Sequence, residues 1–354
     1  MGKLRFGLIG FGAIGRVRAQ ALARSASCSL TAVCDADPAR RASAPAGAAQ
    51  FATASELLNA DACDAVLVST PPDSHAELAV HAMERGKHVI VEKPIAHTAQ
   101  ASAQMLQCAA RTGRTLTVGF NHRYFKGVKH MREAIVRGDL GELRFVKAYT
   151  GHVGLPELKS PWMYDKGVMG GGTLMDNGIH VIDLMRYLMG DVVEVNAVLP
   201  RPVWNVGVEE NAFVQMKGAS GVYGSLHASW TAWQGYKFRL EACGSDGMAE
   251  MSYAPMFSQV VRVTRKPSFT SQRERRFHAA DIVREKLQGW QVTVIDTFLQ
   301  EFDDFRALVD KVQRPLNIAT GLDGAKAQAI ANAAYESAAG GRPVATHITA
   351  MEAA

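Results

Sequence analysis

The chain has 354 residues, of which 47% are hydrophobic and 21% are charged. At roughly 150 residues per domain this length indicates about two domains, and the ordinary composition excludes a disordered chain, a collagen and a small disulfide-rich protein. Lys and Arg (39) exceed Asp and Glu (34) by 5, and such an excess can mark an anionic partner, depending on where it lies.

Short apolar runs alternate with helical patterns from the N-terminus to about residue 120. Helices are expected at Ala13–Arg24 and His75–Arg85, among others, and Asp37-Pro38 is typical of a helix start. Near-continuous apolar strands that alternate with helices predict a doubly wound parallel sheet covered on both faces. The expected strands are Leu4–Ile9, Leu30–Cys34, Ala65–Ser69, His88–Glu92 and Thr115–Gly119.

After Asn121 the pattern changes to strands with polar and apolar residues in alternation. Helices are expected at Tyr124–Arg137, about 173–188, Gln291–Val312 and Thr320–Ala339. Successive alternating strands predict a mostly antiparallel sheet with one packed and one free face. The expected strands are Arg144–Thr150, Val192–Leu199, Val208–Lys217, Val222–Trp230, Tyr236–Cys243 and Met248–Met251.

The first expected strand leads into a glycine-rich run that opens a helix, Gly10-Phe11-Gly12-Ala13-Ile14-Gly15. In a dinucleotide-binding fold the first glycine of such a run allows the tight turn, the second allows the backbone to approach the pyrophosphate, and the third allows close packing of helix on strand. A mere strand-to-helix turn is the alternative. We predict an α/β Rossmann domain over residues 1–122, followed over 123–354 by an α+β domain for substrate binding and oligomerisation. This second domain is expected to hold a large, open sheet with helices on one face.

Asp35 ends the next strand, twenty residues after Gly15. Its carboxylate is expected to accept hydrogen bonds from the adenosine ribose and to repel a 2′-phosphate, which favours NAD as the cofactor. Arg40 and Arg41 follow closely, and an arginine there can bind a 2′-phosphate instead, so NADP stays open.

Glu92-Lys93-Pro94 follows a strand of the parallel sheet, at the carboxyl edge where doubly wound folds bind ligands. Lys93 is a candidate proton donor there, although a lysine on a loop is more often only solvated. In the expected helix after Gly170-Gly171-Gly172, Asp176, His180 and Asp183 have the spacing of one helix face. A carboxylate beside an imidazole suits proton transfer.

Two other interpretations of this helix are a metal site and a face that packs against the core. No Cys, Glu or second His stands near Asp176 and His180 in the sequence to complete a ligand set, so we predict no metal. A buried face would satisfy its polar groups internally.

Together these motifs resemble the glucose–fructose oxidoreductase/inositol dehydrogenase/rhizopine catabolism (Gfo/Idh/MocA) oxidoreductase family. The resemblance runs from residue 4 to about Val344. The motifs that carry it are the glycine-rich run, Glu92-Lys93-Pro94, Gly119-Phe120-Asn121-His122-Arg123-Tyr124, the three glycines with Asp176 and His180, and the ending Tyr335-Glu336-Ser337-Ala338 with Gly341-Arg342-Pro343-Val344.

The resemblance implies an NAD(P)-dependent dehydrogenase that acts on a hydroxyl of a sugar, a polyol or a sugar derivative. By likeness to the family, His180 is the main acid/base, Lys93 assists as proton donor or acceptor before a Pro94 that is often cis, and Asp176 holds His180 or binds substrate. Thr70, Pro71, His75, Glu92 and Lys93 match segments beside the cofactor. Arg123, Tyr124 and Trp162 match stretches that line the substrate cleft, and nothing is inferred from His122.

Two alternatives stay open. One is a glycosidase that uses bound NAD transiently, and the other is a non-catalytic sensor of sugars or dinucleotides on the same fold. The presence of Lys93, Asp176 and His180 counts against a sensor. Trp204, Trp230, Trp233 and Tyr236 could stack on a sugar, although aromatic residues in strands more often pack in a core or interface.

The rest of the sequence sets the expected surroundings of the protein. Five scattered cysteines favour reduced, buried thiols, and no apolar stretch approaches the ~20 residues of a spanning helix, so we expect a cytoplasmic protein without membrane or nucleic-acid partners. The free sheet face and the family resemblance suggest a homodimer or homotetramer. The window from Arg262 to Lys286, which includes Lys266, holds eight basic and three acidic residues and so carries the whole excess of +5. We interpret it as a solvated connection, with a contact to an acidic sugar, a nucleotide-sugar or a neighbouring subunit as the alternative.

Overall fold

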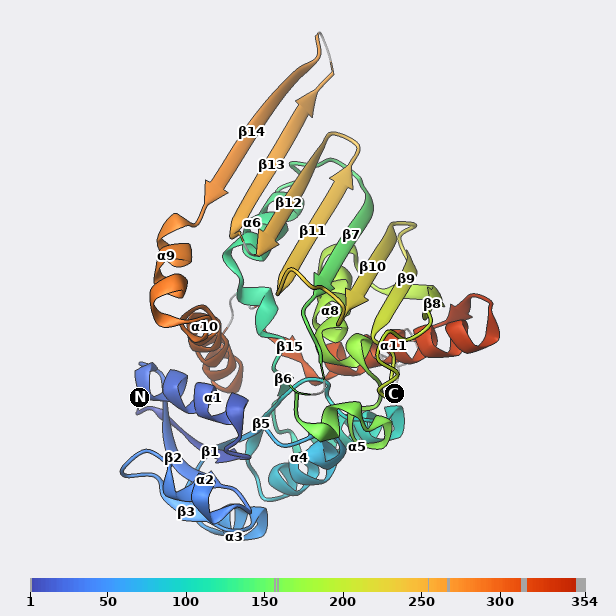
Figure 1. Cartoon of the computed structure of the whole chain (residues 1–354). Helices are drawn as coiled ribbons and strands as arrows, with labels where there is room; N and C mark the ends of the chain where they lie inside the picture. Colours follow the sequence, from blue (N-terminus) through green and yellow to red (C-terminus); the bar gives the residue numbers. More distant parts are fainter. Residues whose placement is uncertain are drawn as a thin grey trace. The chain divides into compact units, whose positions relative to one another are not determined.

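The computed structural model describes residues 2–155, 157, 159–253, 255–265, 268–312 and 317–347 (Figure 1). Its contacts divide the chain into two compact units, one of Met1–Tyr124 with Glu285–Ala325 and one of Phe125–Arg284 with Lys326–Ala354. The division at Tyr124 lies close to the boundary expected after residue 122. The sequence-based division, however, placed 285–325 in the second domain, whereas these residues pack in the first unit.

The first unit contains a seven-stranded sheet in the order β15-β6-β5-β4-β1-β2-β3. Strands β1 to β6 are parallel, and β15 is antiparallel to β6. This topology confirms the predicted Rossmann fold. The strands are β1 (Leu4–Ile9), β2 (Cys28–Cys34), β3 (Ala49–Phe51), β4 (Ala65–Val68), β5 (His88–Val91), β6 (Leu116–Val118) and β15 (Ala319–Thr320).

Helices α1 and α10 pack on each other beside this sheet. The apolar core there joins Phe6 and Leu8 of β1 to Phe298, Phe302 and Phe305 of α10. Burial of three phenylalanines accounts for the return of the chain to the first unit. The helices are α1 (Ala13–Arg24), α2 (Pro38–Ala42), α3 (Ala54–Asn59), α4 (His75–Glu84), α5 (Ala99–Thr112) and α10 (Gln291–Val309).

The second unit contains a nine-stranded sheet in the order β14-β13-β12-β11-β7-β10-β9-β8-β16. Strands β7 and β10 are parallel, whereas the other neighbours are antiparallel, so the prediction of a mostly antiparallel sheet is confirmed. The strands are β7 (Leu143–Gly151), β8 (Val192–Val198), β9 (Asn211–Gly218), β10 (Tyr223–Ser229), β11 (Lys237–Gly244), β12 (Gly247–Tyr253), β13 (Phe257–Thr264), β14 (Thr270–Phe277) and β16 (Val344–Ala345).

Two helices pack against strands of this sheet, α6 on β12 and β13, and α8 on β7 and β10. Alternate residues of β9 are buried and exposed, as a sheet with one covered face requires. Among the described residues from 125 on, the helical segments apart from α10 are α6 (Lys126–Val136), η4 (Pro161–Tyr164), α7 (Lys166–Met169), η5 (Leu174–Gly178), α8 (Ile179–Met189), α9 (Ala279–Gln288) and α11 (Gly321–Gly340).

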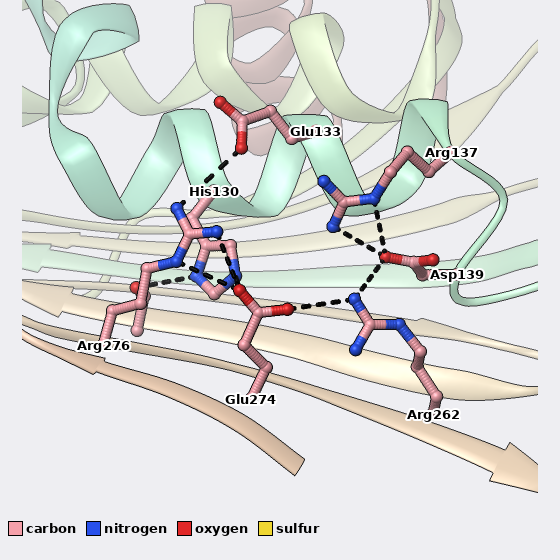
Figure 2. A network of polar contacts seen from close by, with 8 residues as sticks. His130, Glu133, Arg137, Asp139, Arg262, Glu274 and Arg276 are labelled. Carbon is pink, nitrogen blue, oxygen red and sulfur yellow. Dashed lines mark hydrogen bonds and ion pairs between the residues drawn. The ribbon is translucent and has the colours of Figure 1, made fainter. Parts of the chain in front are cut away.

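The basic window from Arg262 to Lys286 is largely exposed, as expected, but the interpretation as a connection was wrong, because the window forms regular elements of the second unit's sheet and a helix. It comprises the end of β13, the edge strand β14 and most of α9. Within the part that the structure describes, which excludes Lys266, Arg262 forms ion pairs with Asp139 at 2.7 Å and with Glu274 at 3.1 Å (Figure 2). Arg276 pairs with Glu274 at 2.7 Å, so acidic partners offset part of the excess charge.

The imidazole of His130 lies at the centre of this network and is completely buried on α6 (Figure 2). Its Nδ1 lies 3.0 Å from Ser258 Oγ, and its Nε2 lies 3.1 Å from Glu274 Oε1. These contacts tie the edge strand β14 to α6.

Elsewhere, all five cysteines are free and four are buried, as predicted. Among the described helices, none combines the length and apolar character needed to cross a bilayer.

Candidate active site

The glycine-rich run after β1 is crowded on its inner side and open on its outer side. Gly10 has φ +93, and a Cβ there would lie 2.7 Å from the carbonyl oxygen of Ser69, whereas a Cβ on Gly15 would overlap the carbonyl oxygen of Gly10. A Cβ on Gly12 would meet nothing nearer than Arg40 Nη1 at 4.0 Å. The crowding at Gly10 and Gly15 keeps the turn tight, and the free space at Gly12 leaves room for a pyrophosphate against the backbone N–H groups.

The carboxylate of Asp35 lies beside this cradle. Its Oδ2 accepts a hydrogen bond from the Phe11 N–H at 2.7 Å, and its Oδ1 accepts one from the Asp37 N–H at 2.9 Å. Arg41 Nη1 donates to the carbonyl oxygens of Asp35 and Ala36, so this guanidinium is engaged by the backbone.

Arg40 is the more available of the two arginines. Its side chain is 50% exposed and lies 3.7 Å from Asp35 and 3.4 Å from Asp37. The structure therefore places an acid and an arginine together beside Gly12, with the acid the more firmly held of the two.

Two loops at the carboxyl edge of the parallel sheet are joined by His75, which is completely buried. Its Nδ1 lies 2.9 Å from the carbonyl oxygen of Pro94, and its Nε2 lies 2.9 Å from that of Thr70. Burial lowers the pKa of this imidazole. Pro71 follows Thr70 in the same loop, and the Lys93–Pro94 peptide bond is cis, as the resemblance implies. The structure thus brings Thr70, Pro71, His75 and Lys93 to one edge.

Glu92 lies behind Lys93, and its carboxylate faces inward. Arg18 of α1 donates from Nε to Glu92 Oε1 at 2.7 Å and also pairs with Glu301 of α10. The guanidinium stacks on the Phe298 ring, 3.5 Å from its centroid. This pairing gives Glu92 a structural role in the first unit, and its contact with cofactor stays a prediction.

His122, for which no role was predicted from the sequence, is a neighbour of Lys93. Burial and the positive charge of Lys93 lower the pKa of His122 to about 3, so this imidazole is neutral at physiological pH. The residues that follow it point into the first unit: Arg123 pairs with Asp323 at 3.6 Å, and Tyr124 donates to Asp304 at 3.0 Å. Their binding of substrate stays a prediction.

In the second unit, the carboxylate of Asp176 is the centre of a polar cluster. Its Oδ2 lies 3.1 Å from His152 Nε2 and 3.3 Å from Lys159 Nζ, and it accepts a hydrogen bond from Trp230 Nε1 at 3.1 Å. The sequence did not predict His152 or Lys159, because both stand far from Asp176 along the chain. Trp230 is completely buried and acts here as a hydrogen-bond donor.

The expected helix over 173–188 is not a uniform α-helix. Leu174–Gly178 forms a π-helical turn that carries Asp176, and His180 follows in the first turn of α8. Both residues are largely buried, with 7% and 8% of their surface exposed. The α-helical spacing used to place Asp176, His180 and Asp183 on one face does not hold through a π turn.

The other aromatic candidates of this unit lie in different surroundings. Trp162 is partly exposed in η4. Trp204 and Trp233 contact edge to face at 5.7 Å, and Trp233 is 64% exposed. Tyr236 packs edge to face on Tyr253. Trp233 is the one among these with a broad accessible face.

Comparisons with known proteins identify the family to which the chain belongs. Residues 4–120 match the family described as "Oxidoreductase family, NAD-binding Rossmann fold", and residues 128–250 match the "GFO/IDH/MocA C-terminal domain". Inositol 2-dehydrogenase of Rhizobium meliloti (strain 1021) is 32% identical over 351 residues, which cover 96% of this chain and 98% of that protein. The chain belongs to the GFO/IDH/MocA family.

Other members of the family show the same relation. Myo-inositol 2-dehydrogenase of Thermotoga maritima is 29% identical over 69% of this chain and 74% of that protein. A solved structure of levoglucosan dehydrogenase in complex with NADH and L-sorbose has a TM-score of 0.84 at 25% identity, over 98% of this chain and 99% of that chain. These findings confirm the predicted family and fold, NAD as the cofactor, and a dehydrogenase that acts on CH–OH groups.

Proposed function

We propose that this chain is an NAD(P)-dependent dehydrogenase whose substrate is a sugar, a polyol or a sugar derivative. The observation that carries the proposal is the pyrophosphate cradle at Gly10–Gly15 with Asp35 beside it. The names of the relatives, inositol 2-dehydrogenase and levoglucosan dehydrogenase, support this substrate class.

The first unit fits the cofactor. Backbone N–H groups of the glycine-rich run would hold the pyrophosphate, Asp35 would accept hydrogen bonds from the adenosine ribose, and Thr70, Pro71, His75 and Lys93 would lie toward the nicotinamide. When bound, the cofactor supplies the hydride acceptor. The buried His75 lies 2.9 Å from the carbonyl oxygens of both Pro94 and Thr70 and so links the loop that carries Lys93 to the loop that carries Thr70.

The candidate residues of the two units have separable roles in this proposal. His180 accepts the proton of the reacting hydroxyl, and Lys93 serves as a further proton donor or acceptor. Asp176 is held by His152, Lys159 and Trp230 and presents a fixed carboxylate that orients either the imidazole or a substrate hydroxyl. Arg123, Tyr124 and Trp162 are weaker candidates for substrate binding.

We further propose that the protein is cytoplasmic and forms a homodimer or homotetramer. The free face of the nine-stranded sheet supports self-association, because Phe213 and Tyr223 on β9 and β10 are 47% and 58% exposed. The molar mass in solution tests this proposal, and a monomer at micromolar concentration would contradict it.

The experiment on function assays a panel of sugars and polyols with NAD and then with NADP, and follows NADH or NADPH absorbance. Lys93→Ala and His180→Ala are each expected to lower kcat by about 10²- to 10⁴-fold, while NADH still binds. Lys286→Ala, an exposed lysine on α9, serves as a matched control. Near-normal turnover in either active-site variant contradicts its role, and turnover of a glycoside without net NADH would indicate the glycosidase instead.

A further inference from the structure

One glutamate binds three consecutive backbone N–H groups where the second unit's candidate site begins. Glu209 Oε2 accepts from the Gly172 N–H at 2.8 Å, and Glu209 Oε1 accepts from the Leu174 N–H at 2.9 Å. The Thr173 N–H between them donates to the backbone carbonyl oxygen of Glu209 at 2.9 Å. These are N–H groups of a helix start, which have no partner within the helix itself.

Asp176 is two hydrogen bonds away from this glutamate. The carbonyl oxygen of Gly172 accepts from the N–H groups of Met175 and Asp176, each at 3.0 Å. Gly172 therefore receives Glu209 on one side and supports the backbone of Asp176 on the other. A shift of Glu209 is therefore expected to shift Gly172, whose carbonyl oxygen accepts the hydrogen bond of the Asp176 N–H.

Tyr335 of α11 completes the clamp, which we define as Glu209 with Tyr335. Its hydroxyl donates to Glu209 Oε1 at 2.8 Å. A Cβ on Gly171 would overlap this hydroxyl, and a Cβ on Gly172 would overlap the Glu209 carbonyl oxygen. The clamp thus explains why glycines occupy these two positions, for which the sequence offered no reason.

The chemistry of the clamp fits an ionised carboxylate. The two backbone N–H groups and the tyrosine hydroxyl each direct a hydrogen toward it, and its side chain is partly buried. Burial raises the pKa of Glu209, and the donors from Leu174, Tyr335 and Gly172 oppose this shift. Burial and the charge of Glu209 raise the pKa of Tyr335 well above its usual value, so its hydroxyl remains a donor at neutral pH.

We propose that Glu209 and Tyr335 are positioning residues that fix the π-helical turn and so hold Asp176 in its catalytic place. This inference rests on the proposed function of Asp176. The clamp belongs to the second unit, whereas the glycine-rich run and Asp35 belong to the first, so its loss is expected to affect turnover and not cofactor binding.

Tyr335→Phe tests the proposal with the smallest change, because it removes one donor and keeps the ring. We expect kcat to fall about tenfold for Tyr335→Phe and about a hundredfold for Glu209→Gln, since small misplacements at an active site cost this much. The Kd for NADH, measured by fluorescence, should stay within about twofold of the wild-type value.

Ser337→Ala is the matched control. Ser337 is a completely buried hydroxyl on the same helix that donates to the Arg342 carbonyl oxygen at 2.7 Å and accepts from the Ala197 N–H at 3.0 Å. Its loss should lower thermal stability without lowering kcat. If Ser337→Ala reduces kcat as much as Tyr335→Phe does, the effect is one of stability and the proposal is wrong.

Amide hydrogen exchange of residues 172–176 provides a readout independent of turnover. The clamp predicts faster exchange in Tyr335→Phe and Glu209→Gln and unchanged exchange in Ser337→Ala. Unchanged exchange in both clamp variants overturns the proposal, as does faster exchange with wild-type kcat. A wild-type protein that oxidises no compound of the panel contradicts the proposed function, a failure visible without any variant.

Discussion

The guanidinium of Arg18 lies 2.7 Å from the carboxylate of Glu92, and both side chains are buried. Arg18 belongs to the helix that the glycine-rich run opens, and Glu92 precedes Lys93. One ion pair therefore joins the segment expected to hold the cofactor to the segment that carries a candidate proton donor. Glu301 of α10 pairs with the same guanidinium and brings the returning part of the chain into this contact.

Replacement of Arg18 should be strongly destabilising. Burial raises the pKa of Glu301, and Arg18 opposes that shift, so Arg18→Met leaves two buried carboxylates without their cation. Loss of one partner of a buried pair costs about 3–5 kcal/mol of unfolding free energy. Urea unfolding measures this loss, and Arg18→Met/Glu301→Gln should lose less than Arg18→Met alone.

The exposed pair Arg111–Glu84, with side chains 63% and 46% exposed, is the control for that prediction. Arg111→Ala should lower the free energy of unfolding far less than Arg18→Met does, because water screens an exposed pair. Equal losses for Arg18→Met and Arg111→Ala would show that the buried pair has no special weight.

A second prediction concerns the choice of cofactor. Asp35→Ser removes the carboxylate that holds the Phe11 N–H and that lies 3.7 Å from Arg40. NADH affinity should fall by about tenfold or more, because a hydrogen bond to a charged group is lost. NADPH affinity should rise, since the repulsion of a 2′-phosphate disappears and Arg40 is freed to bind it.

Fluorescence titration with each reduced cofactor tests this prediction without any substrate. In Asp35→Ser/Arg40→Ala the gain for NADPH should vanish while the loss for NADH remains. A double variant that retains the gain would show that Arg40 has no part in it.

Much of the fold could be predicted because it is encoded locally. Helix α1 has the bounds expected from its apolar spacing, and Asp37 caps α2 by accepting the Ala39 N–H, as Asp37-Pro38 indicates. The strands β13 and β14 were missed. The segment Thr270–Phe277 is charged and almost wholly exposed at a sheet edge, so it lacks the buried, alternating residues by which a strand is recognised.

The candidate site was predicted only where its residues lie in motifs. Lys93, Asp176 and His180 stand in short runs that resemble a family. Tyr335 also stands in such a run, but its contact with Glu209, like that of His152 with Asp176, joins segments far apart in the chain, which no local pattern encodes. The π turn at Leu174–Gly178 also escaped prediction, because apolar spacing does not distinguish one extra residue in a turn.

A third prediction concerns acid. The unfolded chain protonates an imidazole at its usual pKa of 6.5, whereas His122 in the folded protein has a pKa of about 3. The unfolded state therefore binds more protons between these values, so stability is full above pH 6.5 and is lost as the pH falls toward 3. At about pH 5 the free energy of unfolding is therefore lower than at high pH by about 2 kcal/mol on account of His122.

Urea unfolding of wild type and His122→Gln at about pH 8 and about pH 5 isolates this contribution. The variant should lose less stability between the two values than the wild type does. Burial also lowers the pKa of His75, so the variant should still lose some stability in acid. Equal losses in the two proteins would place the proton elsewhere.

The last prediction compares two glycines that lie close together in the chain. A Cβ on Gly172 would overlap the backbone oxygen of Glu209, whereas a Cβ on Gly167 would meet only the flexible carboxylate of Asp165 at 3.2 Å. Gly172→Ala must displace backbone and should lower the free energy of unfolding by about 2 kcal/mol or more. Gly167→Ala in the short helix α7 should be neutral or stabilising by about 0.5 kcal/mol, since alanine favours helices. Thermal unfolding and kcat of the two variants test this difference, and a soluble, fully active Gly172→Ala protein would show that the loop can relax away from Glu209.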